Sequence, residues 1–128
     1  MNPSDQARQV GIVDSWLWQT HNAGGATNPG AGAVISDVGP LAAGYYDVEA
    51  IITFINTATL DKILLEHRNA ADDATLLYGP ILIKVGESGT VVIHWRNFKV
   101  LSSERFRVIV ESGYTGYVAA AIRAVRRA

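Results

Sequence analysis

Hydrophobic and polar residues alternate with a period of two through most of the chain after residue 40. Between Tyr45 and Ile55, five apolar or aromatic residues share one face of an extended segment: Tyr46, Val48, Ala50, Ile52 and Phe54. Asp47, Glu49 and Thr53 occupy the opposite face. Because side chains of a strand point alternately to its two sides, this pattern predicts a half-buried strand with a defined inner face.

Similar short runs, separated by turn residues, predict about eight strands in all. The others are Val10–Trp18, Gly32–Ser36, Leu60–Arg68, Leu76–Val85, Thr90–Arg96, Arg105–Glu111 and Thr115–Val125. Gly79-Pro80 interrupts one run and favours a bend or an edge position, since proline cannot donate a ladder hydrogen bond. We therefore predict an all-β fold, an antiparallel β-sandwich of jelly-roll type. Its core should also contain Val91, Ile93, Trp95, Phe106, Val108 and Val110.

Two segments leave the pattern less clear. The run after residue 117 fits a strand, but Val118, Ile122 and Val125 also have the spacing of an alanine-rich helix. We favour the strand because an aromatic residue and a glycine-containing turn precede the run. Small residues and turn formers dominate His21–Ala33, which predicts an exposed, mobile loop. This loop would divide an N-terminal strand or arm, residues 1–33, from a sandwich domain, residues 34–128.

Length, composition and charge exclude several classes of protein. The chain has 128 residues, which is the size of one domain, and it lacks cysteine, which rules out disulfides and thiolate metal sites. Its net charge of −1 gives no electrostatic reason to expect nucleic acid as a partner. No apolar stretch has the length of a membrane span, and the first residues do not resemble a secretion signal. We expect a protein without a membrane or nucleic-acid partner.

Candidate catalytic and metal-binding residues do not form recognisable motifs. His21, His67 and His94 stand apart, and none has a carboxylate at a spacing typical of a barrel metal site. His67 is better interpreted as a hydrogen-bonded residue at the end of a strand. No serine occurs in the context of a nucleophile elbow. The sequence therefore predicts no catalytic residues, no metal and no cofactor.

Two groups of residues are candidates for contact with a partner. The first lies on the expected outward face of the C-terminal strands and combines arginine with aromatic residues: His94, Arg96, Arg105, Arg107, Tyr117 and Arg123. Arginine and tyrosine are enriched at interfaces, and Asp47, Glu49 and Glu66 of a neighbouring copy could pair with these cations. The alternative is an ordinary solvated sheet face. The second group, Trp16 and Trp18, either covers the core or forms a docking patch, because alternation places both indoles on one face.

Four stretches together resemble the jelly-roll head decoration (cement) proteins of tailed bacteriophages. They are GYYDVEAIITF at 44–54, ILLEHRNAADDATL at 63–76, GTVVIHWRNFKVLSSERFRVIV at 89–110 and TGYVAAAIRAVRR at 115–127. The same order of strands is similar to trimeric tumour-necrosis-factor (TNF) and complement-C1q-like modules. The resemblance covers residues 40–127 and rests on strand pattern, without an invariant motif.

The resemblance implies a non-enzymatic structural protein that binds the outside of a phage head as a homotrimer. Its partners would be further copies of itself and the major capsid protein, and its location would be the virion exterior after synthesis in the host cytoplasm. An N-terminal arm in such proteins often reaches neighbouring subunits, which fits residues 1–33. The alternative is a carbohydrate- or receptor-binding sandwich of a phage fibre, with the tryptophan pair as its platform.

Overall fold

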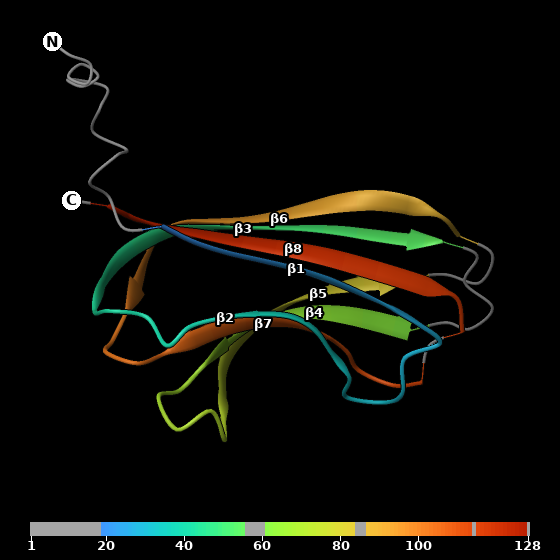
Figure 1. Ribbon diagram of the computed structural model, residues 1–128, viewed down its shortest axis with the longest axis horizontal. Helices are drawn as coiled ribbons and strands as arrows, with labels where there is room; N and C mark the ends of the chain where they lie inside the picture. Colours follow the sequence, from blue (N-terminus) through green and yellow to red (C-terminus); the bar gives the residue numbers. More distant parts are fainter. Residues whose placement is uncertain (1–18, 56–60, 84–86, 114, 128) are drawn as a thin grey trace, which may run out of the picture.

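Eight antiparallel strands form two four-stranded sheets that pack face to face (Figure 1). The structure, a computed structural model, describes residues 19–55, 61–83, 87–113 and 115–127. Its strands are β1 (Gln19–Thr27), β2 (Val34–Val38), β3 (Gly44–Ile55), β4 (Asp61–Arg68), β5 (Thr75–Ile83), β6 (Gly89–Val100), β7 (Arg105–Val110) and β8 (Tyr117–Arg127). No helix in the described part of the chain has the length and apolar character needed to cross a membrane. The predicted all-β sandwich is confirmed.

The order of strands is β1-β8-β3-β6 in one sheet and β2-β7-β4-β5 in the other. Of the described strands, only β4 and β5 are neighbours both in the sequence and in a sheet. Every other connection passes from one sheet to the opposite one, which is the wiring of a jelly roll. Strand β5 lies at the edge of its sheet, as Pro80 suggested.

The core fills the space between the two sheets and follows the alternation of the sequence. Strand β3 buries every second side chain from Tyr46 to Phe54, as predicted. From the facing sheet, β4 contributes Ile63 and Leu65, and β7 contributes Phe106 and Val108. Val91, Ile93 and Trp95 of β6 face the core but are only half-buried. Their partial exposure follows from the position of β6 at the edge of its sheet, where side chains have a neighbouring strand on one side only.

The C-terminal run is a strand, which decides the choice between strand and helix. Strand β8 lies between β1 and β3, and both of its edges carry ladder hydrogen bonds. Ala120 pairs with Gly24 on one side and with Ile52 on the other. The helix alternative would have left both neighbouring strands unpaired along this side.

The prediction of an exposed loop at His21–Ala33 is wrong for its first half. Residues Gln19 to Thr27 form β1, which pairs with β8 along its whole length. The glycines have a packing role here, because a β-carbon at Gly24 would overlap the carbonyl oxygen of Ile35 in β2. A β-carbon at Gly25 would instead meet the side-chain hydroxyl of Tyr117. The sandwich therefore includes β1, and the predicted strand Val10–Trp18 lies outside the described residues.

Alanine substitutions at these two adjacent glycines should have different effects. Gly24→Ala is expected to lower the free energy of unfolding by about 1–3 kcal/mol, because the backbone of β2 must move away from the new methyl group. Gly25→Ala should be nearly neutral, since the exposed Tyr117 ring can rotate aside. Urea unfolding of the two variants measures the difference, and equal effects would contradict the close approach of β1 to β2.

Candidate functional site

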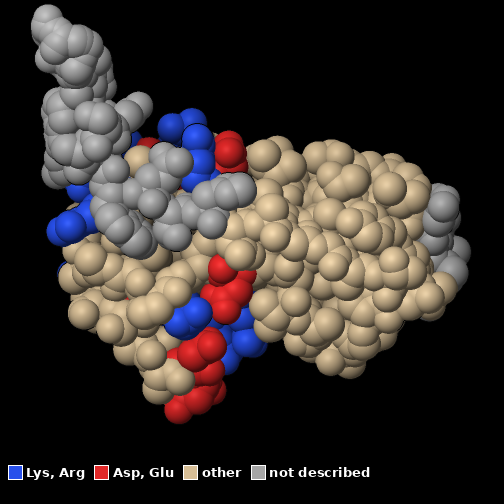
Figure 2. Space-filling view, in the orientation of Figure 1, with Lys and Arg blue, Asp and Glu red and all other residues tan. Residues whose placement is uncertain are grey.

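The outer face of the β1-β8-β3-β6 sheet carries small and apolar side chains over about half of its length. Strand register places Ile51 of β3 between Val92 of β6 and Ala121 of β8. The next outward row consists of Thr53, Thr90 and Ala119, and the two threonine hydroxyl groups lie 3.0 Å apart. Beyond it, Ile55 pairs with Tyr117. None of these rows contains a charged residue, and on the side drawn in Figure 2 the charged side chains lie toward the other end of the sandwich.

Charged residues begin one row away from Ile51 on the same face. Glu49 lies between Arg123, at 3.8 Å, and His94. Further along, Asp47 accepts a hydrogen bond from the Asn97 amide at 2.9 Å and pairs with Arg127 at 2.6 Å. The Asn97 hydrogen bond, followed by the interactions with Arg127, lowers the pKa of the Asp47 carboxyl group. The face thus divides into an uncharged end and a charged end.

The six residues predicted as an interface lie on both outer faces of the sandwich. His94, Tyr117 and Arg123 belong to the face just described. Arg96 is exposed on β6 beside the bulge that separates the pairings of Tyr46 and Val48. Arg105 and Arg107 belong to β7, in the other sheet. Because β6, β7 and β8 alternate between sheets, the structure does not gather the predicted set on one surface.

Arg105 and Arg107 form ion pairs within their own chain. Arg107 Nε donates to Glu66 Oε1 at 2.6 Å, and an Arg105 nitrogen lies 3.3 Å from both carboxylate oxygens of Asp37. Arg68 Nε donates to Asp72 at 2.9 Å, and this hydrogen bond is the main reason for the lowered pKa of Asp72. We expected three carboxylates to pair with cations of a neighbouring copy. All three have partners in the same chain instead: Asp47, Glu49 and Glu66.

His67 is buried, and its ring contacts aromatic side chains and a buried carboxylate. Its Nε2 lies 2.9 Å from Glu104 Oε1, and the ring stacks on Phe106 and meets Phe98 edge to face. The same Glu104 oxygen accepts a hydrogen bond from the Leu101 amide at 2.7 Å. This arrangement confirms the interpretation of His67 as a hydrogen-bonded residue. Within the described ranges, no three histidines or carboxylates are grouped as metal ligands.

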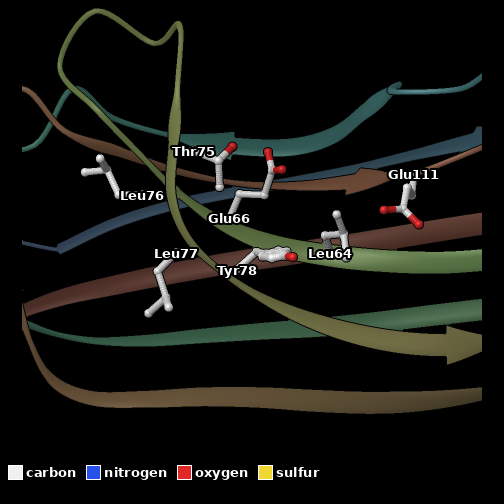
Figure 3. A pocket seen from close by; sticks show the side chains of 7 residues that line it. All are labelled: Leu64, Glu66, Thr75, Leu76, Leu77, Tyr78 and Glu111. Atoms are coloured by element: carbon white, nitrogen blue, oxygen red, sulfur yellow. The ribbon is translucent and has the colours of Figure 1, made fainter.

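A groove on the β2-β7-β4-β5 sheet was not found from the sequence. It has a volume of about 500 Å³ and is lined by Leu64, Glu66, Thr75, Leu76, Leu77, Tyr78 and Glu111 (Figure 3). Most of its lining comes from β5 and from β4 beside it. The pairing of β4 with β5 brings Leu64 and Glu66 beside Tyr78, and this pairing cannot be read from either strand alone. Trp16 and Trp18 lie outside the described residues.

Comparison with solved structures identifies the fold. The chain is similar to the TNF protein Eiger from S. frugiperda, with a TM-score of 0.60 and 13% identity over 88% of this chain and 93% of that one. It is also similar to part of an arabinose-bound α-L-arabinofuranosidase, with a TM-score of 0.52 and 10% identity over 80% of this chain and 18% of that one. No protein-family model and no curated protein sequence matches the chain.

The fold is a TNF-like jelly-roll sandwich. This confirms the resemblance to TNF-like modules at the level of architecture. The comparisons give no support for the resemblance to phage decoration proteins: neither of these two structures is such a protein, and identities of 10–13% relate the folds alone.

Proposed function

We propose that the protein is a non-enzymatic assembly module that associates with copies of itself as a homotrimer. The observation that carries this proposal is the uncharged end of the β1-β8-β3-β6 face, where three consecutive rows expose only small, hydroxylated, aliphatic and tyrosine side chains. Contiguous exposed apolar surface marks interaction sites in proteins, and Ile51, Val92, Ile55 and Tyr117 are the exposed large hydrophobic residues of these rows. The alanines in its middle allow another backbone to approach closely.

The edge formed by β6 and by the second half of β5, residues 79–83, is the surface that would contact this face on a neighbouring copy. Strand β5 contains no charged residue, and the charged residues of β6, Arg96 and Lys99, lie in the half of that strand away from the uncharged rows. Proteins usually protect edge strands with charged residues or by covering them. A contact between a face and an edge joins two different surfaces, so it forms a closed ring when the rotation from one copy to the next divides a full turn evenly. The TNF-like fold supports a ring of three.

The shell of a tailed phage is the proposed partner of the trimer. The support for this finer proposal is the resemblance of residues 40–127 to phage head decoration proteins. The protein would bind the major capsid protein on the virion exterior, after synthesis in the host cytoplasm. Trp16 and Trp18, which precede β1, are proposed to dock on the shell or on a neighbouring subunit.

A charge on the uncharged face should prevent self-association. Val92→Glu is expected to convert the trimer to monomers without unfolding the chain, because Val92 is 56% exposed and points away from the core. Leu101→Glu is the matched control, since Leu101 is 57% exposed but lies in the turn between β6 and β7. Sedimentation velocity of the three proteins measures their masses.

The wild type and Leu101→Glu should sediment as trimers, and Val92→Glu as a monomer with an unchanged far-UV circular dichroism spectrum. A wild type that stays monomeric at all accessible concentrations would overturn the proposal. If Val92→Glu still sediments as a trimer, the subunits do not contact one another through this face.

A further inference from the structure

The groove beside β5 has the features of a small-molecule site. Its volume of about 500 Å³ lies within the range that proteins use for small ligands. Figure 3 shows Glu66 and Thr75 side by side on one wall and Tyr78 near Leu64, with Leu77 directed away from Glu66 and Thr75. The groove therefore combines an aromatic side chain with polar groups.

The polar groups of the groove are mostly hydrogen-bond acceptors. Glu66 is held in position by Arg107, which donates to Oε1 at 2.6 Å and is its one hydrogen-bond partner among the described residues. Thr75 Oγ1 accepts a hydrogen bond from Arg68 at 2.8 Å, so its own hydroxyl hydrogen remains able to donate. Glu111 supplies a second carboxylate. Such a lining suits a ligand with several hydroxyl groups, which both donate and accept hydrogen bonds.

The charges of the groove favour a neutral ligand. Arg107 already balances Glu66, and Lys62 lies 3.6 Å from Glu111. A cationic ligand would therefore find little unbalanced negative charge. An anionic ligand would meet two carboxylates in the lining and no lining cation.

Exposed apolar groups complete the site. Tyr78 is 54% exposed, and Leu76 on the same strand is also exposed. A sugar ring has an apolar face of C–H groups and a rim of hydroxyls, which matches an aromatic ring beside fixed acceptors. We propose that this groove binds a neutral saccharide, whose ring stacks on Tyr78 while its hydroxyl groups bind Glu66 and Thr75. This inference concerns a single subunit and does not depend on the proposed trimer or its capsid partner.

Titrations with sugars of matched shape test the proposal. The probes are glucose, galactose, mannose and N-acetylglucosamine, with glucuronate as the acidic counterpart of glucose. In two-dimensional amide NMR spectra, at least one neutral sugar should shift the signals of residues 75–78 at millimolar concentrations, whereas glucuronate should not. Tyr78→Phe should keep the binding, and Tyr78→Ala should weaken it by about tenfold or more. Tyr45→Ala, which removes an exposed tyrosine from the other sheet, is the control and should bind like the wild type.

Several results would overturn the proposal. They are an absence of shifts with every neutral sugar, equal shifts with glucuronate, and unchanged binding by a folded Tyr78→Ala variant. Shifts of the same amides that depend on protein concentration without sugar would show instead that a second copy covers the groove.

Discussion

Replacing Phe106 by alanine should lower the free energy of unfolding by about 3–5 kcal/mol. Its side chain is fully buried, and its ring centroid lies 5.2 Å from that of His67 and 5.6 Å from that of Phe98. The Trp95 ring, at 6.1 Å, completes a cluster that joins β4, β6 and β7. The substitution leaves a cavity between the two sheets, because neighbours held in two hydrogen-bonded sheets can relax only partly.

Urea unfolding at a fixed protein concentration measures this loss, since self-association would make stability depend on concentration. Leu101→Ala is the control, because Leu101 is exposed and its truncation should cost little. A loss below about 1 kcal/mol for Phe106→Ala would contradict its position in a close-packed core.

Removing the Glu104 carboxylate should destabilise the protein by a similar amount, about 3–5 kcal/mol. Glu104 is buried, and its Oε1 serves both His67 Nε2 and the Leu101 amide. Glu104→Ala removes both interactions at once and leaves two polar groups with little access to water. A buried donor without an acceptor lowers the free energy of unfolding, so the loss of the Glu104 carboxylate should destabilise the protein as much as the loss of a core aromatic ring.

Glu104→Gln separates the role of the acceptor from that of the charge. The amide oxygen of glutamine can take the place of Oε1 for both partners, so this variant should lose clearly less stability than Glu104→Ala. Thermal unfolding of the three proteins, monitored by circular dichroism, measures the order. Equal losses for both variants would show that the carboxylate charge, and not the acceptor oxygen, holds His67 and the β6–β7 turn.

These two residues link stability to the surfaces proposed for function. The cluster around Phe106 joins β6, whose Val92 belongs to the uncharged face, to β4, whose Glu66 lines the groove. Variants that disturb the cluster would alter both surfaces together. Val92→Glu and Tyr78→Ala instead change exposed side chains, which is why they can test self-association and sugar binding separately.

Alternation along the chain was enough to predict the class of fold and the inner faces of its most regular strands. In β3, every second residue from Tyr46 to Phe54 is apolar or aromatic, and the structure buries this set although Ile51 is apolar on the outward face as well. The same holds for Phe106, Val108 and Val110 of β7. A period of two is a local property that any strand must satisfy when one of its faces is buried, so it can be read without knowing the neighbours.

Which strands share a sheet, and what each outward residue contacts, could not be predicted without the folded chain. Gly24 suggested a flexible loop because glycine permits many conformations, and its actual role depends on the Ile35 carbonyl of another strand. The outward arginines of β7 were grouped with residues of β6 and β8, whereas the jelly roll places β7 in the opposite sheet beside Glu66. The groove at Tyr78 likewise arises from the pairing of β5 with β4. The alternation predicts that a side chain points away from the core. Which residue it contacts there depends on the long-range pairing of strands, and a period of two contains no information about that pairing.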